Sequence, residues 1–405
     1  ERATTVVDGA AEYRFSSELF QQVCYDSLLH RERSQLHADV ARVLAAVDFD
    51  VEPTLLARHY RLAERPTQAV ECLLRAAESQ LLASSLSEAE EVLVTVAEIL
   101  QDRSVVAAKR VAQRDQRVRY HRARAELLRQ RGRLDEALAE VDRAFEVLGY
   151  PERRRDEAEL QSNTDYAGLY TIRGQVFQTR ANYREAVTAF EEALGRLSDI
   201  DVEVCERVSV RASIAWNLLK LEEVEEARTI SQAVVTKYEG ETLDEPALAN
   251  AVARHHDTLG QLAFVAEDYQ VAFDFYVQAR DLRLIDGNVA LLAHSEGNLA
   301  GASAMLGEWE LAARAFERVI SQWITLGNVE LVCISRLNLT ECLLELCERT
   351  ESADLARAIH SQASRELDRA DELVEMLDAG SLRTPAADLR RRLEVNKKHE
   401  LTLVR

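Results

Sequence analysis

The sequence predicts an all-α protein built from consecutive helix pairs, and two observations support this prediction. The first is composition: the 405 residues include only 5 Pro and 14 Gly, whereas 47% are hydrophobic. Ala, Leu, Glu and Arg predominate, which favours helices over strands. The second is a repeated spacing of apolar residues, first visible in ANYREAVTAFEEAL at residues 181–194. There Tyr183, Ala186, Phe190 and Ala193 fall on one face of a helix.

The same spacing occurs six times along the chain. Each predicted turn contains an apolar residue, which we call the anchor: Leu86, Leu134, Tyr183, Val224, Tyr269 and Trp309. Alanine follows every anchor by three residues, and Ala or Gly precedes every anchor by nine. A small residue on the first helix lets the alanine of the second helix approach closely. A larger side chain usually follows the anchor by seven residues, but Ser231 breaks this column, so we expect the unit anchored at Val224 to be the weakest.

These columns resemble the tetratricopeptide repeat, over roughly residues 67–348. The resemblance implies a right-handed α-α superhelix. The anchors lie 48, 49, 41, 45 and 40 residues apart, which exceeds the usual repeat of about 34 and is similar to the extended repeats of maltose-activator-type bacterial regulators. We therefore expect an array of six or seven helix pairs at residues 53–380. Residues 381–405 would form a capping helix or the start of a further repeat.

The first 52 residues lack the repeat columns. Residues 13–44 have the spacing of two amphipathic helices, and the order of their aromatic and apolar residues resembles the end of the winged-helix region in bacterial signal-transduction (STAND-type) ATPases. Such proteins are often fused to nucleotide cyclase or helix-turn-helix output domains. The resemblance implies that residues 1–52 form a helical segment that links the array to an upstream ATPase domain. Since the sequence begins with Glu1 rather than Met, we expect it to be a segment of a longer protein.

The sequence contains no motif that predicts catalysis. The P-loop, HExxH, GxSxG and GxGxxG patterns are all missing from the sequence, so we expect no enzyme and no cofactor in this segment, with ATP bound only in the upstream domain. The adjacent residues His255, His256 and Asp257 point about 100° apart on a helix, which predicts surface histidines rather than a metal site. The six cysteines form no CxxC pair and predict buried free thiols in a reducing compartment.

Charge and hydropathy restrict the partners. A net charge of −20 argues against direct nucleic-acid binding. No run of 18 apolar residues predicts a membrane span, so we expect a cytoplasmic protein.

The resemblance also indicates a binding groove, because the first helix of each pair lines the inner wall in this kind of array. Residues that precede each anchor by fifteen, twelve, eight or five positions face the groove. Together with Lys220, which lies beside this column, the candidates are Arg119, Arg122, Arg129, Gln175, Gln178, Trp216, Arg254, Asp257, Gln261 and His294. Cationic, amide and aromatic side chains suit an extended peptide, a carboxylate or a docking surface of the upstream domain. The alternative is that the arginines at 119–129 only form ion pairs with Glu126 and its neighbours along their own helix.

Two functions remain open at this stage. The first is a non-catalytic regulatory platform of a larger ATPase, which binds a protein, a peptide or a small-molecule effector. The second is a stand-alone adaptor that binds peptide segments of partner proteins.

Overall fold

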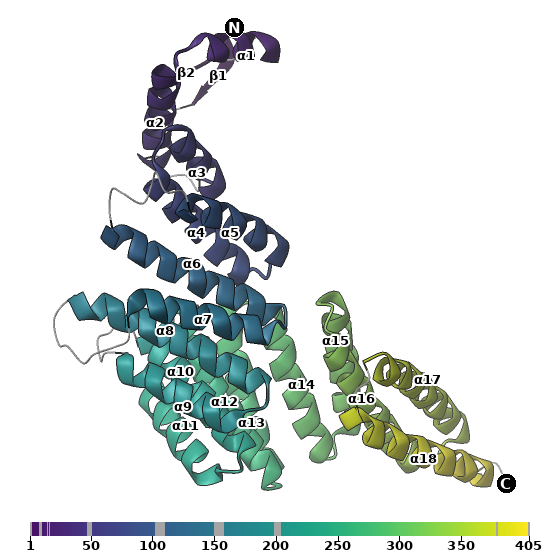
Figure 1. Cartoon of the computed structure of the whole chain (residues 1–405). Helices are drawn as coiled ribbons and strands as arrows, with labels where there is room; N and C mark the ends of the chain where they lie inside the picture. Colours follow the sequence, from purple (N-terminus) through teal and green to yellow (C-terminus); the bar gives the residue numbers. More distant parts are fainter. Residues whose placement is uncertain are drawn as a thin grey trace. The chain divides into compact units, whose positions relative to one another are not determined.

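The computed structural model describes residues 2–7, 10–13, 15, 17–46, 51–101, 110–149, 158–197, 204–377 and 380–403. Over these residues the chain forms eighteen helices and one two-stranded antiparallel hairpin (Figure 1). The chain divides into two compact units, Glu1–Thr179 and Arg180–Arg405. Each unit has its own buried core.

Unit 1 begins with the hairpin and continues as helices. Its elements are β1 (Arg2–Val7), β2 (Ala10–Tyr13), α1 (Glu18–Ser27), α2 (His30–Ala46), α3 (Pro53–Leu62), α4 (Pro66–Leu82), α5 (Leu86–Gln101), α6 (Arg110–Gln130), α7 (Leu134–Leu148) and α8 (Ala158–Thr179).

The helices α1 and α2 match the two predicted in the first 52 residues, but the hairpin was not predicted. Val7 pairs with Ala10, so the expectation of a helical segment is wrong for residues 2–7 and 10–13. The sequence did hold a signal: β-branched residues at 4–7 precede Asp8-Gly9, a dipeptide favoured in two-residue hairpin loops.

Unit 2 is helical over its described residues. It comprises α9 (Tyr183–Arg196), α10 (Val204–Lys220), α11 (Val224–Tyr238), α12 (Pro246–Val265), α13 (Tyr269–Asp286), α14 (Val289–Met305), α15 (Trp309–Thr325), α16 (Val329–Arg349), α17 (Ala353–Leu377) and α18 (Gly380–Leu403).

All six anchors begin a helix, and the turn before each anchor has one geometry. The residue two positions before the anchor adopts positive φ in every case: Ser84, Gly132, Ala181, Glu222, Glu267 and Gly307. In five of these turns the N–H just before the anchor donates to the carbonyl six residues before the anchor, at 2.8–3.0 Å. This is the Schellman arrangement that ends a helix. Four of the six residues are not glycine, so the turn geometry tolerates an ordinary side chain in the left-handed region.

The small-residue columns are buried between the paired helices. All six alanines that follow the anchors by three residues are 0% exposed: Ala89, Ala137, Ala186, Ala227, Ala272 and Ala312. The small residues nine positions before the anchors are buried as well. At Gly260 an added Cβ would lie 2.6 Å from Cε1 of Tyr276 on the facing helix. The predicted close approach of paired helices is therefore confirmed within unit 2.

Ser231, which breaks the column of large side chains, is compensated by a histidine. Ser231 is buried on α11, and its hydroxyl lies 3.2 Å from Nδ1 of His255 on α12. The other imidazole nitrogen, Nε2, lies 3.2 Å from the Val208 carbonyl oxygen, which can only accept, so Nε2 carries the proton and Nδ1 accepts from Ser231. A polar pair occupies the position that a larger apolar or aromatic side chain occupies in the other units.

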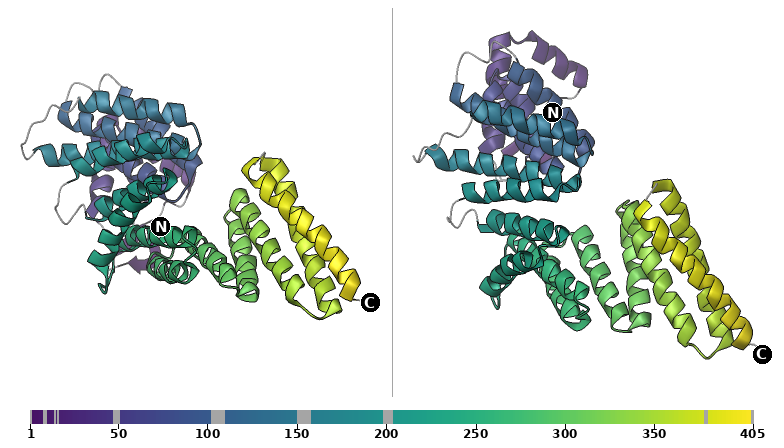
Figure 2. Two further views of the ribbon diagram at one scale, coloured as in Figure 1. Left: turned by 90° about the horizontal axis from the view of Figure 1, so that it is seen from below. Right: turned by 60° about the horizontal axis from the view of Figure 1, so that its bottom comes forward.

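The helix α18 covers the end of unit 2. Figures 1 and 2 show α16, α17 and α18 side by side, and Leu389 and Leu393 of α18 join the core formed with α16 and α17. Arg392 adds ion pairs to Glu345 (2.8 Å) and Glu348 (3.1 Å) of α16.

Candidate functional site

Arg119 holds two helices of unit 1 together. Its guanidinium on α6 makes paired hydrogen bonds to Glu71 (2.8 and 2.9 Å) and to Glu78 (2.8 and 3.0 Å), both on α4. These charge-assisted bonds, those to Glu78 above all, raise the pKa of Arg119. Arg119 therefore does not pair along its own helix, which was the alternative to ligand binding. Its guanidinium is instead occupied by the two glutamates of α4.

The other two arginine candidates of α6 differ, since Arg129 is ion-paired and Arg122 lies close to α8. Arg129 pairs with Glu126 three residues earlier, at 2.6 and 2.9 Å, as the alternative reading predicted. Arg122 lies over the bare backbone of α8, where a Cβ on Gly168 would be 3.1 Å from its Nη1. Gln175 and Gln178 are half-buried on α8.

The Trp216 ring, near the end of α10, contacts Lys220 and Tyr183. Lys220 Nζ lies 5.1 Å from the Trp216 ring centre, within the range of a cation–π contact. Tyr183 meets the same indole edge-to-face at 6.0 Å. Gln261, on α12, is exposed.

The structure brings Arg254 and Asp257 of α12 together with Arg283 of α13. We call these three residues the Arg254–Arg283 cluster. Arg254 donates from Nη1 to the Ser209 carbonyl oxygen (3.2 Å) and Oγ (3.1 Å), and from Nη2 to Ser213 Oγ (2.9 Å). Arg283 donates to the Asp257 carboxylate and to the Ser295 hydroxyl of α14. Side chains of four helices therefore converge here.

Burial and like charge shape the electrostatics of this cluster. Burial, with the neighbouring charge of Arg283, lowers the pKa of Arg254 to about 10, and Asp257 only partly opposes this. Arg283 is 3% exposed, but its charge is matched by Asp257. Among the described residues no carboxylate contacts Arg254. The cluster thus holds two cations and one anion.

His294, the remaining candidate, lies at the edge of this cluster on α14. Its pKa is lowered by burial and by Arg283, while Asp257 opposes the shift. His294 is exposed, and its Nδ1 lies 3.5 Å from Nδ2 of Asn298.

Arg283 was not among the predicted site residues because it lies on the second helix of its pair. The prediction selected only residues on the first helix of each pair. A signal was present: Arg283 follows Tyr269, Ala272, Tyr276 and Ala279 at helical spacing, so a cation occupies the buried stripe of α13. Ser209 and Ser213 were missed because a serine on a helix carries no distinctive pattern.

The two central histidines correct a prediction. His255 is 0% exposed and His256 is also buried, so the expectation of surface histidines is wrong. Burial lowers the pKa of each to about 4. Within the described ranges, no three His, Cys, Asp or Glu side chains are placed to share a metal ion. The six cysteines are free thiols, four of them buried.

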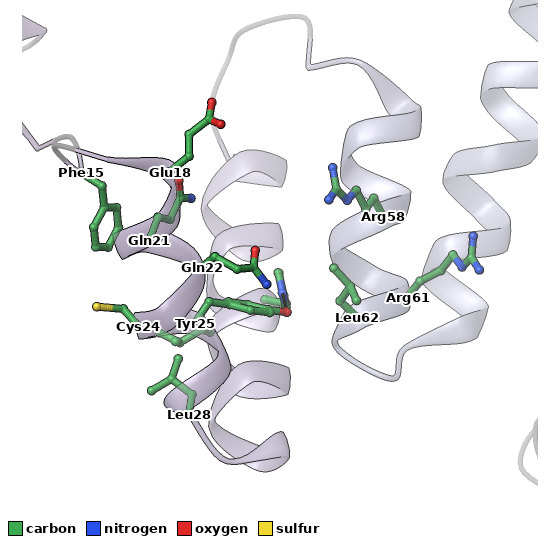
Figure 3. A pocket seen from close by; sticks show the side chains of 12 residues that line it. Phe15, Glu18, Gln21, Gln22, Cys24, Tyr25, Leu28, Arg58, Arg61 and Leu62 are labelled. Carbon is green, nitrogen blue, oxygen red and sulfur yellow. Dashed lines mark hydrogen bonds between the residues drawn. The ribbon is translucent and has the colours of Figure 1, made fainter.

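A second feature lies at the start of unit 1, where α1, α2 and α3 enclose a pocket of about 1110 Å³. Figure 3 shows Gln22 and Tyr25 extending from α1 toward α3, whose residues Arg58 and Leu62 line the opposite wall. Tyr25 Oη lies 2.8 Å from His37 Nε2, and His37 Nδ1 lies 3.0 Å from His59 Nδ1. Burial lowers the pKa of both histidines, which favours neutral rings in this chain of contacts.

No helix in the described part of the chain combines the length and apolar character that a membrane span requires.

Comparison with known proteins gives matches among solved structures. The chain matches no protein-family model and no curated protein. It is similar to the crystal structure of a Rap protein complexed with competence and sporulation factor, with a TM-score of 0.51 and 16% identity over 92% of this chain and 99% of that chain. It is also similar to the apo form of the quorum sensor NprR from B. thuringiensis, with a TM-score of 0.53 and 13% identity over 96% of this chain and 100% of that chain.

The fold is tetratricopeptide-like. A tetratricopeptide repeat protein from Parabacteroides merdae also matches, with a TM-score of 0.45 and 13% identity over 81% of this chain and 99% of that chain. At these identities the likeness shows the fold alone. The predicted helix-pair array is confirmed, and its binding residues remain a prediction.

Proposed function

We propose that the chain is a non-catalytic repeat platform that binds an extended peptide or protein segment along the first helices of its pairs. The observation that supports this most directly is the strip formed by Trp216 on α10 and by Arg254, Asp257 and Gln261 on α12. Residues 254, 257 and 261 fall on one helix face, and Arg254 reaches across to α10. Such a strip offers stacking, charge and amide hydrogen bonds, which together suit a peptide backbone with side chains.

The structural neighbours support the proposal at the level of fold. The Rap protein holds the competence and sporulation factor in its structure, and NprR is described as a quorum sensor. A repeat array of this fold can therefore serve as a receptor.

A peptide-display library tests this function. Purified chain is used to enrich binders, whose affinities are then measured for the unaltered chain and for Gln261→Ala. Because Gln261 is exposed, its truncation leaves the fold intact, and we expect affinity to fall about 5- to 20-fold through lost hydrogen bonds. Arg314→Gln is the control, since Arg314 is exposed on α15 and forms an ion pair with Glu310 along its own helix. Binders that fail to emerge, or that bind the Gln261 variant and the unaltered chain equally, would contradict the proposal.

A more specific version places the array in a signal-transduction ATPase, with ATP bound by an upstream domain and the platform regulating that domain. The observation that favours it is the apolar surface of α1, which buries none of its residues and leaves Leu19 74%, Phe20 59% and Val23 58% exposed. Contiguous exposed apolar side chains of this kind mark interaction surfaces.

Nucleotide turnover tests this version. The chain is expressed in its full reading frame, and turnover is compared with that of a form lacking the array and with that of a Leu19→Glu, Phe20→Ser double variant. Regulation through α1 predicts that the double variant behaves like the form without the array. Equal turnover in all three proteins would leave the adaptor as the better description.

A further inference from the structure

We propose that a pocket between α11, α12 and α13 binds a small organic cation. The ligand would have an apolar or aromatic body, a hydroxyl group at its buried end and an ammonium group at the mouth of the pocket. This site is separate from the peptide-binding strip, so the inference does not depend on the proposed function.

The pocket has the size and the apolar wall of a small-ligand site. The helix α12 packs against both α11 and α13, and the pocket between them has a volume of about 620 Å³, within the usual range of about 300–1,000 Å³. Its apolar wall is formed by Val235, Leu243, Val252, Phe275, Leu282 and Ile285. Such a wall favours a hydrophobic ligand body of one ring or a short chain.

This pocket faces away from the strip proposed to bind a peptide. On α12 it is lined by Val252 and His256, which stand one helical turn apart. Since successive residues of a helix are rotated by about 100°, these two lie on the opposite side of α12 from Arg254, Asp257 and Gln261. A ligand in the pocket therefore leaves the strip free.

Two buried polar groups in the pocket wall have no hydrogen-bond partner. Tyr238 and His256 both line the pocket and are only 8% and 6% exposed. Among the described residues, none bonds to Tyr238 Oη or to His256 Nδ1. A buried polar atom without a partner costs free energy, and two in one wall indicate that a ligand supplies the missing hydrogen bonds. Because both atoms are closed to water, side chains of the pocket must move for the ligand to reach them.

The two unpartnered groups favour a hydroxyl on the ligand. Burial lowers the pKa of His256 to about 4, so at neutral pH its ring is uncharged and has one donor and one acceptor nitrogen. The Tyr238 hydroxyl can both donate and accept. A ligand hydroxyl has the same two capacities, so it fits either tautomer of His256.

The mouth of the pocket is acidic, which favours a cation. Glu239 and Glu241, in the connection between α11 and α12, and Asp281 on α13 are exposed lining residues. Asp281 pairs with Arg280 at 2.6 Å, whereas in the described part of the chain no cation pairs with Glu239 or Glu241. Lys237 Nζ lies over the Tyr238 ring, 5.1 Å from its centre. An ammonium group on the ligand would supply the charge that these two glutamates lack.

Four small molecules that differ by one group test the proposal. Tyramine has the ring, the hydroxyl and the ammonium group; phenethylamine lacks the hydroxyl, para-ethylphenol lacks the charge, and para-hydroxyphenylacetate reverses it. Affinities are measured by NMR titration of the purified chain. We expect tyramine to bind about 5- to 20-fold more tightly than phenethylamine and about 3- to 10-fold more tightly than para-ethylphenol. The acetate should bind most weakly, because it meets Glu239 and Glu241 with like charge.

Two variants separate the hydroxyl contact from the charge contact. Tyr238→Phe keeps the ring and should remove most of the preference for tyramine over phenethylamine. Since the Tyr238 hydroxyl has no partner to lose, this variant should unfold at the same Tm as the unaltered chain or higher. The double variant Glu239→Gln, Glu241→Gln should weaken both amines about 3- to 10-fold and leave para-ethylphenol unchanged. Glu310→Gln is the control, because Glu310 is an exposed carboxylate of α15 outside the pocket.

Several outcomes would overturn the proposal. If none of the four molecules binds at concentrations up to about 10 mM, the pocket is not a site for this class of ligand. Equal affinities for tyramine and phenethylamine would contradict the role of Tyr238 and His256. Amine binding that weakens as much in Glu310→Gln as in the double variant would show general attraction to an acidic protein. None of these results bears on the peptide-binding strip, which the display experiment tests separately.

Discussion

The ring of Tyr276 packs directly on the backbone of Gly260, and this contact shows why the repeat columns require small residues. Gly260 lies within α12, where glycine is otherwise unfavourable because it costs backbone entropy. A larger residue at this position would clash with the Tyr276 ring of α13, so only glycine allows this contact. Gly301, within α14, has the same backbone setting, but an added Cβ there meets nothing within 4 Å.

The two glycines therefore predict opposite effects of the same substitution. Gly260→Ala should lower the free energy of unfolding by about 1–3 kcal/mol, because the methyl group overpacks the Tyr276 ring. Gly301→Ala should raise it by about 0.5–1 kcal/mol through reduced entropy of the unfolded chain. Urea unfolding followed by circular dichroism measures both. A gain in stability for Gly260→Ala would mean that the close contact is not as the structure shows.

Arg119 shows how a residue predicted to bind a partner can instead stabilise the fold. It connects α6 to two carboxylates one helical pair earlier, and all three side chains keep partial exposure of 25% to 43%. Solvent screening reduces the value of such a pair. Arg119→Ala should therefore lower the free energy of unfolding of unit 1 by about 1 kcal/mol, measured by urea unfolding. The same substitution is then made in a chain that carries Glu71→Gln and Glu78→Gln. If the ion pairs cause the loss of stability, Arg119→Ala should have no further effect there, and an unchanged loss would contradict this cause.

At the scale of one element, α12 carries an unusual interior for a repeat helix. It buries two consecutive histidines, His255 against Ser231 of α11 and His256 against Phe275 of α13. Burial keeps His255 neutral, and its two hydrogen bonds fix one tautomer. Both imidazoles would have to gain a proton inside the core at low pH.

This arrangement predicts that unit 2 becomes less stable as the pH falls. In the unfolded chain each histidine binds a proton near its ordinary pKa of 6.5, whereas in the folded chain the pKa is about 4. Between these values the unfolded state binds more protons, so stability is complete above pH 6.5 and is lost as the pH falls toward 4. The loss should reach about 1–2 kcal/mol for each histidine between pH 6.5 and 5.

Urea unfolding at a series of pH values measures this slope. His255→Gln should be less stable at neutral pH but should show a shallower pH dependence. His30→Gln is the control, because the His30 side chain is 73% exposed and should leave the slope unchanged. Equal slopes in all three proteins would contradict the burial of His255.

At the scale of the whole molecule, stability comes mainly from neighbouring helices. The principal packing partners of each helix stand one or two places away along the chain, as in α10 with α11 and α12, and α16 with α17 and α18. In arrays of this type stability is approximately a sum of local terms. A core mutation should therefore act on the surrounding helices and leave distant ones protected.

Hydrogen exchange tests this locality within unit 2. Leu344→Ala on α16 removes a fully buried side chain and should cost about 2–5 kcal/mol. We expect faster amide exchange in α15 to α18 and unchanged exchange in α10 and α11. Leu218→Ala on α10 should give the reverse pattern. Uniform acceleration across unit 2 in both variants would show one cooperative unit instead of a chain of local terms.

The sequence alone determined the helix pairs, the positions of the turns and the residues at which helices approach closest. These follow from local spacing: apolar and small residues that recur with the helical period must share one buried face, whatever lies on the other side. The sequence also showed that Ser231 interrupts the series of larger side chains seven residues after the anchors.

The tertiary structure decided which polar residues are available to a partner. Arg119 turned out to be paired with two glutamates of α4, whereas Arg254 acquired neutral partners from α10 and a cationic neighbour from α13. The pairings of Arg119 with Glu71, of Arg254 with Ser209 and of Arg283 with Asp257 join residues 26 to 48 positions apart. Their geometry depends on how whole helices are rotated and stacked. A single sequence gives the period of each helix but not which side chains of the neighbouring helix it contacts. The fold was therefore predictable, whereas the ion-pair partners of the charged residues were not.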